Sequence, residues 1–252
     1  MPAIALSRPV DYPESDGRPM AETQVHGQVM LDLLHTLGRR YADVPDLYVW
    51  GNMMFYYVEG DPRASVAPDV FLVHGVDKRV RRIYKLWEEG KAPSLIVEVT
   101  SASTRNEDMK LKKGLYERLG IEEYFLFDPL GEYLRPRLQG YRLVNGRYEP
   151  LSAEEDGALL SRTTGLRLEP EGDRLRLRDA ATGEPLLWAD EEARAREAAE
   201  EDAEAAEENA EQERLARQAA EDNAERERLA REAAEEEVRK LREEILRLRE
   251  GR

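Results

Sequence analysis

The chain contains no cysteine among its 252 residues. This absence excludes a disulfide scaffold, a cysteine-ligated zinc site, an iron–sulfur cluster and a thiol nucleophile. The three histidines are not paired closely in sequence, which argues against a histidine-rich metal site and a Ser-His-Asp hydrolase. No apolar run approaches the ~18–20 residues of a membrane-spanning helix, and the N-terminus lacks the apolar segment of a signal peptide. We therefore expect a cytoplasmic protein with no membrane partner.

The formal net charge of −15 is distributed unevenly along the chain. From Asp190 to the C-terminus there are 23 acidic and 13 basic residues, a net charge of −10. Residues 1–189 hold the remaining 30 acidic and 25 basic residues, a net charge of −5. Because this larger part is only mildly acidic, it can still present a local basic surface, and nucleic acid is not excluded as a partner.

The composition divides the chain into an N-terminal arm (1–21), a domain of mixed helix and strand patterns (22–188) and a charged tail (189–252). The tail is dominated by Ala, Glu and Arg, and its segment 213–226 is followed by a near copy, a repeat of 14 residues or two heptads. This pattern predicts a long helix. Two interpretations of it stay open: a weakly associating coiled coil that joins a homo-oligomer or a protein partner, and a single helix stabilised by i,i+4 ion pairs.

The order of periodic segments in the domain predicts an α/β (α+β) fold, with one mixed β-sheet flanked by at least two helices and followed by the long C-terminal helix. Helical spacing is present in 22–41, ending near Gly38, and in 104–119, where Leu111, Leu115 and Leu119 form the expected core stripe. Strand patterns cover 47–58, 66–73, 94–100 and 123–128, and hairpins are expected within 132–150, around Asn145-Gly146, and within 166–178.

Two carboxylates stand at strand positions where chemistry can be expected. Asp69 follows Pro68 where a β-run begins, and Glu98 lies inside the apolar run 95–99. A charge inside such a strand is costly unless it is paired or coordinates a metal. Glu98 could form an ion pair with a nearby Lys or Arg. Alternatively, the two carboxylates could share a divalent cation, because Mg²⁺ commonly takes one or two protein carboxylates together with water and substrate phosphate.

A large class of nucleases carries a lysine two residues after such a strand acid, on the same face of the strand. Here this position is Thr100, so the simple (D/E)-x-K pattern lacks its third member. Asp108, Lys112 and Tyr116 are spaced by four residues and share a helix face distinct from the leucine stripe. This face could turn Lys112 toward Glu98. The alternative is an ordinary Asp108–Lys112 surface pair, worth about 0.3–0.5 kcal/mol.

In this order and spacing, the segments resemble the Uma family of putative restriction endonucleases, within the PD-(D/E)XK superfamily. The resemblance runs from about Glu22 to Trp188. Two positions depart from the family pattern, Ala102 where proline is usual and Phe125 where tryptophan is frequent. The resemblance is carried by Ala67–Val73, Tyr84–Pro93, Ile96–Thr104, the set Asp108, Lys112, Tyr116 and Gly120, and Glu123–Asp128.

The resemblance implies a restriction-endonuclease-like fold and metal-dependent hydrolysis of phosphodiester bonds in DNA. It implies Asp69 and Glu98 as ligands of Mg²⁺ or Mn²⁺, and Lys112 as the third catalytic residue. Such a cation polarises the phosphoryl oxygen and lowers the pKa of bound water. Accessory roles fall to Thr100, Asp108, Tyr116 and Glu22, although Glu22 can equally be a first-turn acid that complements the helix dipole.

The densest basic cluster of the chain lies between the two carboxylates and is interleaved with Tyr84 and Trp87. Its side chains could contact the phosphate backbone of nucleic acid without reading sequence, or they could neutralise the acidic tail. A competing hypothesis for the whole chain is a catalytically weak or inactive nuclease fold that binds nucleic acid or protein, and Thr100 in place of lysine favours it. The cluster consists of Lys78, Arg79, Arg81, Arg82 and Lys85.

Overall fold

The structure is a computed structural model that describes residues 10–15, 23–101 and 107–250. The chain forms two compact units, Met1–Glu191 and Glu192–Arg252. Among the described helices, none is both long enough and apolar enough to cross a membrane.

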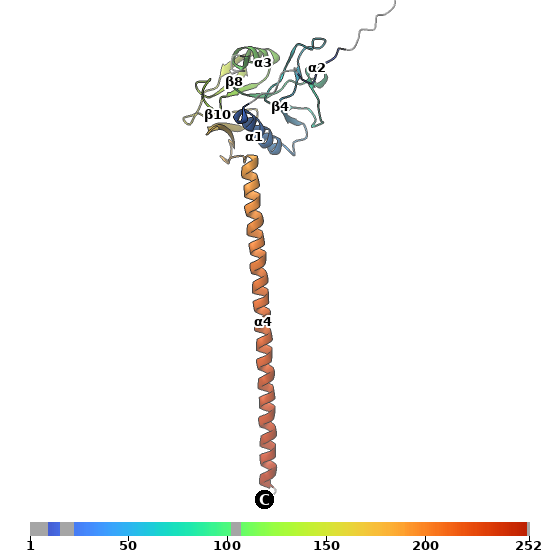
Figure 1. Ribbon diagram of the computed structural model, residues 1–252, viewed down its shortest axis with the longest axis vertical. Helices are drawn as coiled ribbons and strands as arrows, with labels where there is room; N and C mark the ends of the chain where they lie inside the picture. The colour runs from blue at the N-terminus through green and yellow to red at the C-terminus, as the bar shows by residue number, and fades with distance from the viewer. Residues whose placement is uncertain (1–9, 16–22, 102–106, 251–252) are drawn as a thin grey trace, which may run out of the picture. The chain divides into compact units, whose positions relative to one another are not determined.

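A six-stranded mixed sheet forms the centre of the first unit (Figure 1). Its strand order is β1-β4-β6-β7-β8-β9, and β6 and β7 are parallel whereas all other neighbours are antiparallel. The two parallel strands are buried at every position, as their near-continuous apolar sequences predict. The strands are β1 Leu47–Trp50, β4 Val70–His74, β6 Leu95–Val99, β7 Glu123–Phe127, β8 Leu138–Val144 and β9 Arg147–Pro150.

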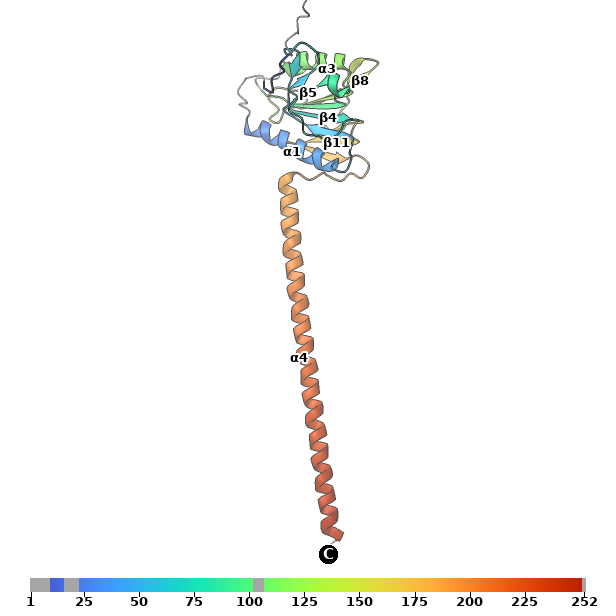
Figure 2. The ribbon, with the colours of Figure 1, turned by 90° about the vertical axis from the view of Figure 1, so that its right-hand side faces the viewer.

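Separate layers cover the two faces of this sheet. The helix α1 packs Val29, Leu33 and Leu37 against one face, together with the leucines of the small sheet β10-β11-β12. The other face is covered by a helical segment, η1 and α3, and by the small sheet β3-β2-β5. Figures 1 and 2 show α1 and α3 on opposite sides of the central strands. These elements are α1 Gln24–Arg40, β2 Phe55–Tyr56, β3 Ser65–Val66, β5 Tyr84–Lys85, α2 Leu86–Glu89, η1 Glu107–Lys112, α3 Lys113–Leu119, β10 Leu159–Leu160, β11 Leu166–Glu171 and β12 Arg174–Asp179.

The predicted α/β class and both predicted hairpins are confirmed. The β8–β9 turn is made by Asn145 and Gly146, whose φ angles of 50° and 79° are those of a two-residue turn that fits the twist of the strands. The second hairpin is β11–β12, and its leucines contribute to the main core.

Three sequence-based element boundaries are corrected by the structure. The run 47–58 is not one strand, because the chain turns at Gly51 and Asn52 and then enters β2. The run 66–73 is likewise divided between β3 and β4. The predicted helix 104–119 begins, in its described part, with a π-helical turn, η1. This wider turn changes the helix register, so Leu111 is 72% exposed instead of joining Leu115 in the core.

The predicted long C-terminal helix is confirmed as α4, Ala189–Glu250, which spans 62 residues. Its first residues belong to the first unit, where Arg176 bonds the Glu191 carboxylate and lies over the ring of Trp188. From residue 193 to 243 every side chain of this helix is exposed.

Candidate active site

The pairing of β4 with β6 brings Asp69 and Glu98 together. Val70 pairs with Val97 in this antiparallel ladder, so Asp69, one residue earlier, lies beside Glu98 at the end of both strands. The backbone N–H of Val99 donates to Asp69 Oδ2 at 2.7 Å, and the Asp69 nitrogen lies 3.4 Å from Glu98 Oε2. The sheet thus fixes both carboxylates at one edge, although 28 residues separate them in sequence.

Lys112 lies against Glu98, as the helix-face spacing allowed. Its Nζ donates to Glu98 Oε2 at 2.9 Å and forms an ion pair of 3.0 Å with Asp108 Oδ1. The Tyr116 hydroxyl donates to the other oxygen, Glu98 Oε1, at 2.8 Å. The π-helical turn η1 carries both Asp108 and Lys112, and both side chains are buried. We call Asp69, Glu98, Asp108, Lys112 and Tyr116 the acid cluster.

His26 contacts the acid cluster and was not singled out from the sequence. The side chain of Thr23 caps α1 by accepting the His26 N–H at 3.3 Å, which sets the histidine in the first helical turn. There His26 is 3% exposed, and its Nε2 lies 3.4 Å from Asp69 Oδ1. The capping threonine is a local signal for this position, but nothing in the sequence indicates that the helix start meets Asp69.

Gly51 is a second residue that the sequence did not indicate. A Cβ atom at this position would lie 1.9 Å from the backbone oxygen of Asp69. The neighbouring Asn52 N–H donates to the Pro68 oxygen at 2.8 Å, so the two chain segments are in direct backbone contact. Only glycine permits this approach, and Gly51 therefore helps to fix the backbone that carries Asp69.

The acid cluster holds three carboxylates and one ammonium group in a site with little solvent. Glu98 is fully buried, and Asp108 and Lys112 are 1% and 8% exposed. Burial raises the pKa of Glu98 to about 8, with Asp69 and Asp108 acting in the same direction and Lys112 opposing them. Burial alone would lower the pKa of Lys112, but Glu98 and Asp108 outweigh it and the pKa is raised. Burial is the main cause that raises the pKa of the Tyr116 hydroxyl, and the neighbouring Glu98 raises it further.

The acid cluster contains the type of ligand that a divalent cation prefers, but both carboxylate oxygens of Glu98 already accept hydrogen bonds in this conformation. Carboxylate pairs supplemented by water and phosphate oxygens are the ligands that Mg²⁺ prefers. The excess of negative charge also favours a cation. However, Lys112 and Tyr116 occupy both Glu98 oxygens, and among the described residues no three His, Asp or Glu side chains form a set of metal ligands. A cation that binds Glu98 would therefore share the carboxylate oxygens with these donors or displace them.

A comparison with known families identifies the family of this chain. Residues 4–177 match the family model Uma2, described as "Putative restriction endonuclease". The chain belongs to the Uma2 family. Among solved structures, a chain described as a putative nuclease belonging to DUF820 from Anabaena variabilis ATCC 29413 shares 15% identity, with a TM-score of 0.43. That match covers 58% of this chain and 76% of the other. A comparison with curated proteins finds no match.

Of two accessory candidates in this Uma2 chain, the structure describes Thr100 but not Glu22. Thr100 is 3% exposed, and its hydroxyl has no hydrogen-bond partner in the described part of the chain. Its backbone N–H donates to Phe127 and thereby continues the β6–β7 pairing. Glu22 lies outside the described residues.

The basic cluster is used largely for contacts within the protein. Arg81 is 8% exposed, donates to Glu89 and Asp77, and lies over the ring of Tyr48. Lys78 donates to the backbone oxygen of Ala42, just after the C-terminal end of α1. His26, which contacts Asp69, lies at the other end of this helix, in its first turn. Carboxylates of the first unit neutralise the other four side chains of the cluster. Lys85 pairs with Glu88, Arg79 with Glu89 and Arg82 with Glu14, and the side chains of Arg79 and Arg82 stay 57% and 80% exposed.

Proposed function

We propose that the chain is an endonuclease that hydrolyses phosphodiester bonds of DNA with Mg²⁺ or Mn²⁺ bound by Asp69 and Glu98. One observation carries the proposal. In a member of a restriction endonuclease family, two carboxylates from adjacent strand ends and a lysine from the following helix meet in one buried cluster. The surplus of carboxylates over ammonium groups there is a cost in stability that a bound cation would relieve.

The chain's own residues have separable tasks in this proposal. Asp108 pairs with Lys112 and keeps the ammonium group charged and directed toward Glu98. Lys112 can then offset the negative charge that develops on the phosphate or position the attacking water. Tyr116 holds Glu98 Oε1 and fixes the carboxylate plane. The bound cation would polarise the phosphate and lower the pKa of a water molecule.

Cleavage of supercoiled plasmid with Mg²⁺ or Mn²⁺ tests the proposal. We expect nicking by the unaltered chain and loss of at least about 10²-fold in rate in Asp69→Asn, Glu98→Gln and Lys112→Met. Glu88→Gln is the matched control, because it also removes a carboxylate charge but lies in α2, where the exposed Glu88 pairs with Lys85. Equal cleavage by Glu98→Gln and Glu88→Gln would refute the assignment of the site.

The hydrogen-bonded state of Glu98 supports a second candidate, a nuclease fold that binds nucleic acid or protein without cutting. In this case the Glu98–Lys112–Tyr116 contacts are permanent and serve the fold. Isothermal titration calorimetry distinguishes the two functions. Metal binding at millimolar Mg²⁺ or Mn²⁺ that is lost in Asp69→Asn favours the nuclease. DNA binding with no metal binding and no cleavage favours the binding protein.

A further inference from the structure

One face of α4 is apolar and has no partner within the unit that it forms. Val238, Leu241 and Ile245 lie on this face at 3–4 spacing and each expose about half of their surface, between 48% and 52%, whereas Leu215 and Leu229 lie on the opposite side of the helix. Regularly spaced exposed apolar side chains on a long helix are typical of a surface that packs against another helix.

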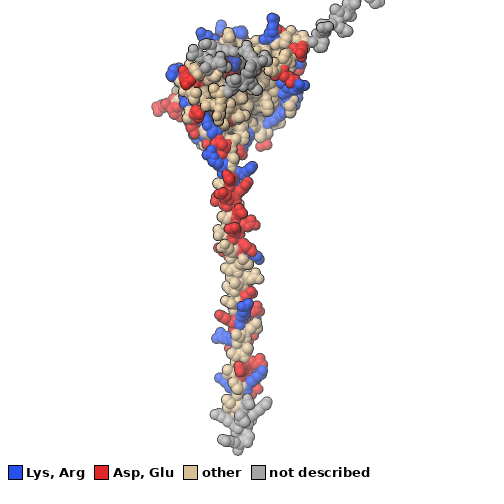
Figure 3. All heavy atoms as spheres, in the orientation of Figure 1, with Lys and Arg blue, Asp and Glu red and all other residues tan. Residues whose placement is uncertain are grey.

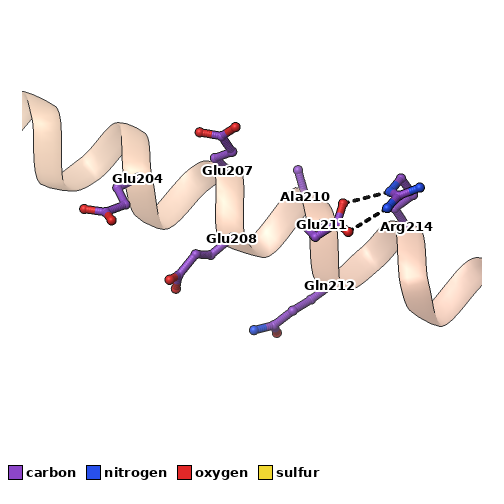
Figure 4. Close-up of a pocket in the computed structure, with 7 residues that line it drawn as sticks. All are labelled: Glu204, Glu207, Glu208, Ala210, Glu211, Gln212 and Arg214. Carbon is purple, nitrogen blue, oxygen red and sulfur yellow. Dashed lines mark hydrogen bonds and ion pairs between the residues drawn. The ribbon is translucent and has the colours of Figure 1, made fainter.

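A continuous seam with the 3–4 spacing of a coiled coil runs along this helix from residue 199 to 245. Of its 14 positions, 10 are apolar and four are charged, and all 14 are exposed. Figure 4 shows one stretch, where Ala210 of the seam lies beside Glu207 and Glu211, and Arg214 pairs with Glu211 along the same helix. The seam consists of Ala199, Ala203, Ala206, Ala210, Glu213, Arg217, Ala220, Ala224, Glu227, Arg231, Ala234, Val238, Leu241 and Ile245.

The four charged seam residues discriminate between the two orientations of a pair of helices. In a parallel, in-register pair each residue faces its own copy, so Glu213, Arg217, Glu227 and Arg231 would give four layers of like charge. Such juxtapositions are strongly unfavourable. In an antiparallel pair, the residue numbers of two facing seam residues add up to the same total in every layer of the seam. With a sum of 444, Glu213 faces Arg231 of the second copy and Arg217 faces Glu227.

The same alignment matches side-chain size and charge along the whole seam. Ala206 faces Val238, Ala203 faces Leu241 and Ala199 faces Ile245, so each large side chain meets a small one. Residues 192–206 carry six acidic and two basic residues, and they lie opposite residues 238–252, with six basic and three acidic residues. Figure 3 shows the acidic first part of α4 on its visible face, with side chains of both signs mixed further along.

We propose that α4 joins two copies of this chain as an antiparallel coiled coil in this alignment, with its twofold axis near residue 222. The seam then extends over about 69 Å at 1.5 Å per residue. The Glu192 residues of the two copies stand about 90 Å apart on the same scale. This inference does not depend on the proposed nuclease activity.

Disulfide trapping in the full chain tests the orientation, and the absence of native cysteine makes it unambiguous. Ala206→Cys and Val238→Cys each place one thiol on the exposed seam. An antiparallel dimer gives cross-linked dimer only when the two variants are mixed before oxidation. A parallel dimer gives cross-links in each variant alone, and that result overturns the proposal. No cross-link in any of the three samples overturns it as well.

Charge reversal tests the alignment by sedimentation equilibrium of the full chain. Arg231→Glu puts like charges in two layers, and we expect self-association weaker by about tenfold or more. Adding Glu213→Arg to it restores opposite charges and should return the affinity to within about threefold of the original. Arg226→Glu changes the net charge equally but lies off the seam, and it is the matched control. A monomer at every concentration, or no rescue in the double variant, contradicts the proposal.

Discussion

Replacing Gly51 by alanine tests how the acid cluster is held in place. The new Cβ would lie 1.9 Å from the Asp69 oxygen and 2.9 Å from the Asp69 carbonyl carbon, both backbone atoms. A shift of about 1.5 Å restores ordinary contact, because non-bonded carbon and oxygen atoms need about 3.4 Å. No flexible side chain can absorb this shift, so the segment carrying Asp69 must move. We expect Gly51→Ala to lower the free energy of unfolding by about 1–3 kcal/mol, the range found for overpacking.

Displacement of Asp69 should also reduce activity, and this loss of activity can be measured separately from the loss of stability. A misplacement of about 1 Å at a catalytic group can reduce the rate about 10²-fold. Gly51→Ala should therefore reduce plasmid nicking at temperatures where urea denaturation shows that the variant is still fully folded. Gly38→Ala is the matched control, because a Cβ there has no atom within 4 Å, and alanine inside α1 should stabilise by about 0.5–1 kcal/mol. A Gly51→Ala protein as stable as the original would refute the reasoning.

Three further predictions concern stability and are measured by urea denaturation. Gly140→Ala should destabilise by about 1–3 kcal/mol, because its Cβ would lie 2.9 Å from side-chain atoms of three core residues, and unchanged stability would contradict the packing. Burial opposes ionisation of Glu123, but Ser161, Arg142 and two backbone N–H groups lower its pKa below 4.5, so its stabilisation is present above pH 4.5 and lost as the pH falls through the lowered pKa. Glu123→Gln should therefore flatten the acid limb of the stability curve. The folded state disfavours ionised Glu98, so the free energy of unfolding should fall as the pH rises from 4.5 toward 8. Glu98→Gln should remove this fall. An unchanged slope in the variant would show that Glu98 is not the source of the fall.

Much of the candidate site could be predicted from the sequence, because strand and helix periodicity determine which side chains share a face. A carboxylate inside an apolar strand and a 108–112–116 polar face made contact between Lys112 and Glu98 one of two hypotheses, and the family resemblance favoured it over a surface pair. The exposed Leu111 was wrongly placed in the core because a π-helical turn leaves no periodic signal of its own. His26 and Gly51 were missed because their importance arises from contacts with Asp69 that only the folded chain creates.

The basic cluster shows a different limit of sequence reading. Its five positive charges suggested a surface for phosphates, but ion pairs depend on which carboxylates the fold brings near. Glu89 lies eight residues from Arg81, and the turn through β5 and α2 places its carboxylate on the guanidinium group. Of the five side chains, those of Lys78, Arg79 and Arg82 are exposed in this conformation.

Two buried carboxylates on adjacent parallel strands, Glu98 and Glu123, have pKa values shifted in opposite directions. Glu123 is 1% exposed, and donors from Ser161, Arg142 and the backbone N–H groups of Arg162 and Thr163 surround it, so its pKa is lowered. Glu98 is fully buried, and burial raises its pKa, with Asp69 and Asp108 adding to the effect and fewer donors than at Glu123 opposing it. A carboxylate that served only the fold would be expected to resemble Glu123. The unfavourable environment of Glu98 agrees with the proposed function, in which an incoming cation would take up the charge of this carboxylate.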